Sequence, residues 1–223
     1  MAKLPYAPDE LPDAEVKVLG AGTILYRIYW RGGAHPSGWA TFRTFGPVPG
    51  SRFDPHPGAG SGRDPEPAEC APVGTLYAAC GEPESGEGII TALAEVFQNQ
   101  RGIDRHANEP WLSAFALAKE VDLLDLTGKW PTRAGTSAAI SSGPKHRARS
   151  WARAAYGAFP QLSGLYYTSS MNQPHPSVVL FERARSALPD RPSLNTPLSN
   201  PDLYDRLEYA AHAITYHLET TYH

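Results

Sequence analysis

Residues 74–97 read GTLYAACGEPESGEGIITALAEVF and contain the strand and the helix on which the fold prediction rests. Residues 76–80 form a short apolar run with glycine on both sides, which predicts a buried strand. A Gly- and acid-rich turn follows, and apolar residues at helical spacing then predict a helix that begins near Gly88. Glu95 falls on the face opposite the apolar one, beside small and polar side chains. The sequence therefore places one carboxylate on an uncrowded helix face, next to the strand that carries Tyr77.

The composition is that of a folded chain with one domain. Of its 223 residues, 41% are hydrophobic, which is enough apolar material for one core. The 22 prolines and 20 glycines predict long, irregular connections between short elements. The formal net charge of −3 gives no overall basic signature, so we expect no direct nucleic-acid binding.

Sequence signals for export, membrane insertion and disulfide bonding are missing. The two cysteines, Cys70 and Cys80, are too few for a disulfide framework or a metal site of four cysteines. No apolar run approaches the roughly 18–20 residues that a membrane helix needs, and residues 1–10 lack the apolar centre of a signal peptide. We therefore expect a cytoplasmic protein without membrane association.

Strand and helix patterns follow one another along the rest of the chain. The content of β-branched, aromatic and apolar residues predicts strands at residues 23–30, 121–126, 164–169 and 177–181. Apolar positions at helical spacing predict helices at residues 146–156 and 200–222, the second with Asn200-Pro201 as its start. Together these patterns predict a single mixed α+β domain at residues 1–223.

The remaining segments are predicted with less regular structure. A helix-like segment is expected at residues 109–118, a short strand at 39–45, and a loop at 184–200, where three prolines exclude a long helix. Residues 1–22 are expected to form an extended lead-in. Residues 54–73 are rich in Pro and Gly, and they are expected to form a surface insertion.

The motifs of several common enzyme classes do not occur. The eight histidines are scattered, and no pair has the His-x-x-x-His spacing with an intervening Glu that binds zinc. The chain also lacks a Gly-x-Gly-x-x-Gly after a strand, a phosphate-loop Lys-Ser/Thr motif and a Gly-x-Ser-x-Gly motif. We therefore expect no metal site and no nucleophilic hydrolase.

What remains is a set of polar residues, each inside an apolar or Gly-rich element. In chain order they are Arg27 in Leu-Tyr-Arg-Ile, Arg52 in Gly-Ser-Arg-Phe-Asp-Pro, Tyr77 in Leu-Tyr-Ala-Ala, Glu95 in Ala-Leu-Ala-Glu-Val-Phe and Ser169 in Gly-Leu-Tyr-Tyr-Thr-Ser. In this order and context, with the Val-Val-Leu-Phe strand that follows, the set resembles the RES-domain family, named for its Arg, Glu and Ser. The similarity covers residues 23–183.

The resemblance implies a fold related to ADP-ribosyltransferases, with a mainly antiparallel sheet core and flanking helices. It implies a toxin of a bacterial toxin–antitoxin pair that degrades NAD at the nicotinamide–ribose bond, as an NAD phosphorylase or an NAD glycohydrolase. NAD is then the substrate, inorganic phosphate is the co-substrate of phosphorolysis, and no prosthetic group is implied. The implied partner is an Xre-type helix-turn-helix antitoxin that blocks the active site in a hetero-oligomer; a homo-oligomer is the other option.

The resemblance also assigns roles to individual residues. The implied catalytic residues are Glu95, Arg27 and Ser169, with Ser170 as a one-residue alternative to Ser169. The implied substrate-binding residues are Arg52 and Tyr77, and the neighbours expected to stack on a ring of the substrate are Tyr26 and Phe53. The sequence departs from the family in the segment between Arg52 and Tyr77, which is longer here and leaves the shape of the site rim open.

These residue types suit the cleavage of NAD. Guanidinium groups bind phosphate through two parallel hydrogen bonds, and an aromatic face can stack on nicotinamide. Breaking the glycosidic bond builds positive charge on the ribose, which a carboxylate stabilises. One carboxylate is sufficient because nicotinamide leaves as a neutral molecule. A serine hydroxyl can orient either the nicotinamide amide or the incoming phosphate.

The remaining arginines and histidines near these motifs are expected to lie outside the site, and two other functions are compatible with the sequence. We expect Arg31 and Arg43 to be surface charges, and His56 and His175 to be loop residues. Two alternative functions stay open: an ADP-ribosyltransferase that modifies a macromolecule, and a non-catalytic nucleotide-binding or interaction module.

Overall fold

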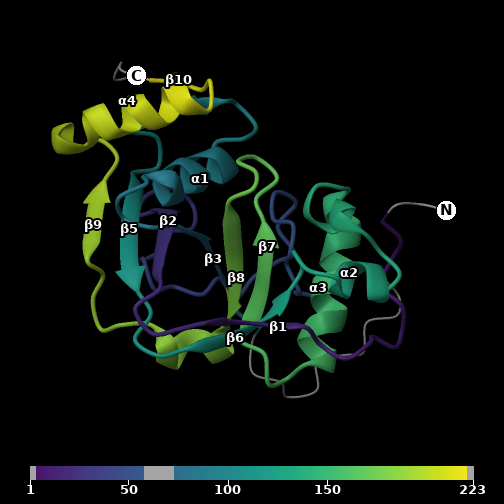
Figure 1. The fold of residues 1–223 in the computed structure, drawn as a ribbon. Coiled ribbons are helices and arrows are strands. Elements are labelled where there is room, and N and C mark those ends of the chain that lie inside the picture. The colour runs from purple at the N-terminus through teal and green to yellow at the C-terminus, as the bar shows by residue number, and fades with distance from the viewer. Residues whose placement is uncertain (1–3, 58–72, 220–223) are drawn as a thin grey trace.

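The protein is built on a twisted eight-stranded sheet (Figure 1). The computed structural model describes residues 4–57 and 73–219. The strand order is β1-β6-β7-β8-β3-β2-β5-β9, and neighbouring strands are antiparallel except for the parallel pair β6 and β7. The strands are β1 (Val16–Leu19), β2 (Ile24–Trp30), β3 (Thr75–Cys80), β5 (Pro110–Ala116), β6 (Val121–Asp125), β7 (Gly164–Thr168), β8 (Pro176–Phe181) and β9 (Leu194–Pro197). The predicted mixed fold with a mainly antiparallel sheet is confirmed.

Four α-helices flank this sheet in the described part of the chain. They are α1 (Glu87–Val96), α2 (Trp130–Arg133), α3 (Lys145–Ala158) and α4 (Tyr204–Ala213). Short 3-10 helices lie at Ala138–Ser141, Glu182–Ala187 and Pro201–Leu203. A small parallel pair, β4 (Gly102–Ile103) and β10 (His217–Leu218), lies beside α4.

The two faces of the sheet are covered differently. One face packs into a continuous core that includes Leu76, Val178 and Leu180 and is closed by the 3-10 helix at Glu182–Ala187. The other face meets two separate groups of helices: α3 packs on β6, β7 and β8, whereas α1 and α4 pack on β2 and β5 (Figure 1). The space above β3, between these two groups, is where a cavity can form.

The strands β2 and β3 separate soon after they pair. They share only the registered pairs Leu25–Cys80 and Tyr26–Ala79, whereas β2 pairs with β5 along its whole length. Arg27 is the next residue of β2 after the last pair. Farther along β3, Arg43 replaces β2 as the neighbour, because its backbone exchanges two hydrogen bonds with Thr75. The divergence of the two strands opens the sheet at the position of the predicted site arginine.

Several boundary predictions were wrong for reasons of tertiary pairing. Residues 109–118 form strand β5 and not a helix, because β5 pairs with β2 on one side and β9 on the other. The predicted strand at 39–45 is reduced to the isolated bridge at Arg43. The predicted loop at 184–200 contains edge strand β9, where Pro197 is tolerated at the strand end.

The predicted terminal and inserted segments also differ from the structure. The lead-in at 1–22 includes β1, which pairs with β6 at the sheet edge. The C-terminal helix is shorter than the predicted 200–222: it ends at Ala213, Thr215 has a positive φ of 56°, and β10 follows. In the insertion at 54–73, residues 54–56 are buried, whereas residues 58–72 lie outside the described residues, as do residues 220–222.

None of the helices in residues 4–57 and 73–219 has the length and apolar character needed to cross a membrane.

Helix α1 is seated on β2 through a glycine. A Cβ atom added at Gly88 would lie 2.1 Å from the Tyr26 ring, so the ring occupies the space that any other residue would need. A Cβ at Gly81 would similarly lie 2.5 Å from the Gly88 backbone nitrogen. The close approach of strand end, helix start and aromatic ring fixes where α1, and with it Glu95, lies above the sheet.

We therefore predict that Gly88→Ala destabilises the protein although alanine favours helix. Overpacking should cost about 1–3 kcal/mol and outweigh the gain in helix propensity. Gly157→Ala is the matched control, because a Cβ at Gly157 in α3 meets nothing within 4 Å. That control should gain up to about 1 kcal/mol. Urea unfolding of both variants measures the difference, and equal shifts would contradict the seating of α1 on Tyr26.

Candidate active site

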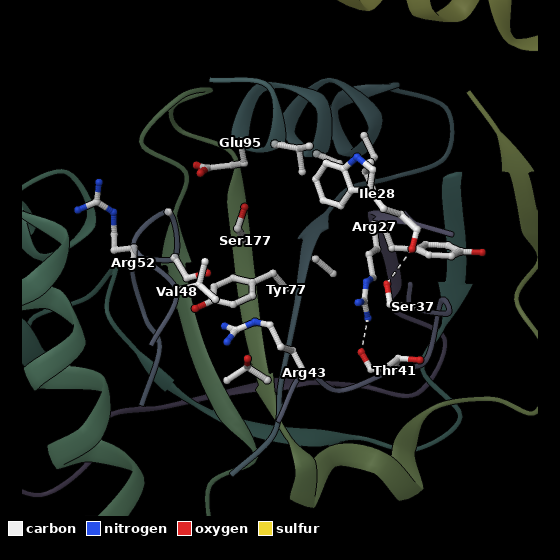
Figure 2. A pocket seen from close by; sticks show the side chains of 18 of the residues that line it. Arg27, Ile28, Ser37, Thr41, Arg43, Val48, Arg52, Tyr77, Glu95 and Ser177 are labelled. Atoms are coloured by element: carbon white, nitrogen blue, oxygen red, sulfur yellow. Dashed lines mark hydrogen bonds between the residues drawn. The ribbon is translucent and has the colours of Figure 1, made fainter. Parts of the chain in front are cut away.

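A cavity of about 790 Å³ opens between the two helix groups, above the point where β2 and β3 separate. Its size is within the usual range of small-molecule sites. Figure 2 shows polar side chains from several elements around it. Its lining includes Tyr26, Arg27, Arg43, Arg52, Tyr77, Glu95, Lys145, Ser170 and Ser177. Residues as far apart in the sequence as Tyr26 and Ser177 therefore share one cavity.

Glu95 enters this cavity from the last turn of α1 with one carboxylate oxygen already bonded. Its Oε1 accepts a hydrogen bond from Ser169 Oγ at 2.5 Å and another from the Ser170 backbone N–H at 3.0 Å. No described residue donates to Oε2. The first oxygen is used to fix the carboxylate, and the second is left for a ligand.

The loop that follows β7 is bound to α1 by polar side chains that lie along one face of the helix. Glu87, Thr91 and Glu95 are four residues apart and therefore lie on the same side of the helix. Asn172 Nδ2 donates to Glu87 Oε2 at 3.1 Å and to Thr91 Oγ1 at 2.9 Å, and His175 Nε2 lies 3.1 Å from the same Glu87 oxygen. His175 was predicted to be a loop residue, and in the structure it also links this loop to α1. Seven residues therefore join the loop to α1, namely Glu87, Thr91, Glu95, Ser169, Ser170, Asn172 and His175.

The two candidate serines have different surroundings. Ser169 is fully buried, and its hydroxyl donates to Glu95 while it accepts from the backbone N–H groups of Met171 and Asn172, each at 3.1 Å. Ser170 lines the cavity and makes no described hydrogen bond through its hydroxyl. Ser169 therefore contacts Glu95 from a buried position, whereas Ser170 faces the cavity.

Arg27 is held in place by backbone carbonyl groups. Its Nη1 donates to Trp39 O and to Thr41 O, both at 3.0 Å, and Figure 2 shows the second of these bonds. Burial, helped by the nearby Arg43 charge and opposed by Tyr29, lowers the pKa of Arg27 to about 10. Arg27 therefore stays cationic at neutral pH and presents its remaining N–H groups beside the cavity.

Arg43 is a cavity residue and not the surface charge that the sequence predicted. Its Nη2 forms an ion pair at 2.8 Å with Asp54, whose side chain is completely buried. Asp54 also accepts from the Val48 N–H at 2.8 Å and contacts the ring of His56. His56, predicted to be a loop residue, is buried in this network. A buried acid thus positions a third arginine at the cavity.

The pKa of Asp54 reflects these contacts. Burial by itself raises that pKa, but the hydrogen bonds from His56 and Val48 and the charge of Arg43 outweigh it and bring the pKa to about 2. Asp54 is therefore ionised throughout the neutral range, and its charge is matched by Arg43.

Arg52 and Lys145 lie on the Glu95 side of the cavity. Arg52 donates through Nη1 to Gly143 O, and Lys145 donates through Nζ to Gly50 O at 2.8 Å and to Gln98 Oε1 at 3.3 Å. Burial lowers the pKa of Arg52, and the Glu95 charge partly offsets this effect. The sequence reading missed Lys145. The sequence does contain a pattern that could have indicated it: Lys145, Arg149 and Arg153 are each four residues apart, so they form one basic face of α3.

The predicted aromatic residues divide between cavity and core. Tyr77 lines the cavity, and burial raises its pKa well above the usual value, while hydrogen bonding to Ser51 and to the Phe53 backbone acts in the opposite direction. Tyr26 also lines the cavity, with its ring against Gly88. Phe53, however, is fully buried and packs on Tyr167 at a centroid distance of 4.7 Å. The prediction that Phe53 stacks on a substrate ring is therefore wrong for this structure.

No group of three or more His, Cys, Asp or Glu residues with the geometry of a metal site occurs in residues 4–57 and 73–219.

One comparison identifies the family, and a second concerns the fold. A model of the RES domain matches residues 24–200, which is most of the chain. Among solved structures, the crystal structure of the M. tuberculosis MbcT–MbcA toxin–antitoxin complex contains a similar chain. The TM-score is 0.52 at 15% identity, over 86% of this chain and 92% of that chain, so the likeness concerns the fold. No curated protein matches the sequence.

The structure predicts that alanine substitution is costly at one of the two candidate serines and nearly neutral at the other. Ser169→Ala removes a buried hydroxyl with three partners and leaves two backbone N–H groups unsatisfied, so it should cost about 2–4 kcal/mol of unfolding free energy. Ser170→Ala should change stability by less than about 0.5 kcal/mol. Chemical denaturation of the two variants checks this, and a costly Ser170→Ala with a neutral Ser169→Ala would reverse the assignment.

The buried Asp54 predicts a specific pH dependence. Because its pKa is about 2 in the folded chain and near the ordinary 3.8 when unfolded, its ionisation stabilises the fold above pH 4, and this contribution falls as the pH drops toward 2. The cost of Asp54→Asn should therefore be about 1 kcal/mol smaller at pH 3 than at pH 6. Urea unfolding at both pH values measures it, and a cost that does not depend on pH would contradict the low pKa.

Proposed function

Because the chain belongs to the RES-domain family, we propose that it is an enzyme that consumes NAD by breaking the nicotinamide–ribose bond. The observation that carries the proposal is the state of Glu95. Its carboxylate is fixed by Ser169 and Ser170 through one oxygen, faces a cavity of about 790 Å³ with the other, and shares that cavity with three arginines. This combination suits a ligand that has phosphate groups and develops positive charge when it reacts.

The proposed reaction assigns a task to each wall of the cavity. Guanidinium groups bind the pyrophosphate of NAD, because planar N–H donors match phosphate oxygens; the candidates are Arg27 and Arg43 at one end of the cavity and Arg52 at the other. Tyr77 and Tyr26 supply aromatic surface for a ring of the substrate. Glu95 Oε2 stabilises the positive charge that develops on the ribose carbon as the C–N bond breaks.

The bond electrons leave with nicotinamide, which departs as a neutral molecule, and the ribose carbon is captured by a nucleophile. We propose water or inorganic phosphate as that nucleophile, which corresponds to an NAD glycohydrolase or an NAD phosphorylase. Ser169 is proposed to act by positioning Glu95, and Ser170 is proposed as the serine that reaches the nicotinamide amide or the phosphate.

The biological role that follows is that of a toxin in a toxin–antitoxin pair. The structurally similar chain belongs to a complex described as a toxin–antitoxin complex, and this likeness supports the proposal through the fold. The proposed partner is an Xre-type helix-turn-helix antitoxin that covers the cavity, and the proposed location is the cytoplasm.

The proposed activity predicts that Glu95→Gln abolishes most turnover. The amide keeps the shape of the side chain and removes its charge, so nicotinamide release from NAD should fall about 10²–10³-fold. Glu120→Gln, at an exposed position between β5 and β6, is the matched control and should keep wild-type turnover. The assay is chromatographic detection of nicotinamide from NAD, with and without inorganic phosphate, using protein purified free of antitoxin.

Two outcomes of this assay would contradict the proposal. One is a wild-type chain, shown by mass spectrometry to carry no bound protein, that releases no nicotinamide in either condition. The other is Glu95→Gln turnover equal to that of the Glu120→Gln control. Transfer of label from adenine-labelled NAD to a macromolecule would instead identify ADP-ribose transfer.

A further inference from the structure

A pair of cations beside Glu95 suggests a more specific feature of this cavity. The segment at residues 50–52 and the start of α3 are joined by two reciprocal contacts. Arg52 donates to the carbonyl of Gly143, just before α3, and Lys145 in the first turn of α3 donates to the carbonyl of Gly50. Each cation is thus held by the backbone of the other's segment, and this arrangement keeps both positive groups at the cavity wall.

A third cation strengthens the same attachment one helical turn further. Arg149 Nη1 donates to Pro49 O at 3.3 Å and to Ser51 O at 3.2 Å. Its role is to hold the 49–52 segment on α3, since its partners are backbone carbonyls of that segment. Arg52 therefore belongs to a segment whose backbone carbonyls are bound by two side chains of α3, Lys145 and Arg149.

The two cavity cations have no matching negative charge. Neither Arg52 nor Lys145 forms an ion pair with a carboxylate in the described part of the chain. Their charges are close enough that Arg52 contributes to lowering the pKa of Lys145, after burial. Glu95 is the acidic group that acts on both in the opposite direction. Two positive charges and one negative charge leave this end of the cavity with a net positive charge.

Other cations at the cavity are arranged differently. Arg43 is neutralised by the buried Asp54 and lies close to Tyr77, and Arg27 lies on the far side of Tyr77 and Ser177 from Arg52 and Glu95 (Figure 2). The cavity therefore has a cationic region at each end, and only the region near Arg43 contains a paired carboxylate.

We infer that Arg52 and Lys145 form a phosphate-binding subsite next to Glu95, in which Lys145 is a ligand-binding residue. Arg52 offers a planar fork of donors, and Lys145 has a third N–H left after its bonds to Gly50 and Gln98. A phosphate between them would offset the repulsion of the two cations. The inference extends the proposed function, because the phosphate is either the pyrophosphate of the dinucleotide or inorganic phosphate that attacks the ribose beside Glu95.

The first test measures phosphate binding without any turnover. Chemical-shift titrations with inorganic phosphate and with pyrophosphate, at constant ionic strength, would compare wild type with Lys145→Gln. Glutamine keeps an N–H donor for the Gly50 carbonyl and removes the charge. We expect about tenfold weaker binding in Lys145→Gln, because a hydrogen bond to a charged group is lost. Lys145→Arg should keep the affinity within about threefold, and Lys119→Gln, at an exposed position after β5, is the matched control.

The second test separates the two sources of phosphate in turnover assays. If inorganic phosphate is the ligand, phosphate accelerates nicotinamide release, and Lys145→Gln raises the half-saturating phosphate concentration about tenfold while KM for NAD stays within twofold. If the pyrophosphate of NAD is the ligand, the rate does not depend on added phosphate, and KM for NAD rises instead.

The inference would be overturned by Lys145→Gln protein that is folded, by its thermal unfolding, and binds phosphate and pyrophosphate as tightly as Lys119→Gln. This result is distinct from failure of the proposed function, in which wild-type protein binds pyrophosphate through Lys145 yet releases no nicotinamide from NAD.

Discussion

The hydrogen bond between Ser169 and Glu95 is the interaction on which the rest of the site depends. It joins a strand end to a helix that lies 74 residues earlier in the sequence, and it fixes the direction of the carboxylate. The same hydroxyl accepts two backbone N–H groups of the loop that it begins, so the loop and the carboxylate are ordered by one side chain. Because Ser169 is fully buried, water does not compete for these bonds.

The two helices beside the cavity, α1 and α3, each bind a neighbouring irregular segment through side chains spaced four residues apart. On α1, polar residues at positions 87, 91 and 95 bind the loop after β7; on α3, basic residues at 145, 149 and 153 bind carbonyls of the segment that carries Arg52. Side chains four residues apart lie above one another on a helix, so one face can hold an extended segment over more than two turns. The irregular connections required by a Pro- and Gly-rich chain are thereby given fixed positions next to the sheet.

Charge is arranged so that most cavity cations are stabilised without losing their ability to bind an anion. Arg27, Arg52 and Lys145 donate to backbone carbonyls, which stabilise a positive charge and do not cancel it. Arg43 is the exception, because it is neutralised by the buried Asp54, and the pKa of Asp54 lies far below neutral pH. Burial of Arg27 reduces its pKa but leaves it charged at physiological pH. The cavity keeps a positive field that suits a phosphorylated ligand.

The amino-acid sequence alone determined the family, the mixed fold, and the strand–helix unit that carries Tyr77 and Glu95, because these follow from local periodicity and from short motifs. It also named Arg27, Arg52 and Ser169, but it could not separate Ser169 from Ser170, since their difference is burial. Only the tertiary structure decided that 109–118 is a strand, that Phe53 belongs to the core, and that Arg43 and Lys145 face the cavity. Those outcomes depend on strand pairing and on contacts between distant segments, namely β5 between β2 and β9, Arg43 on Asp54, and Lys145 on Gly50. Local sequence patterns contain no record of such long-range contacts, because their free energy arises only when the chain has folded.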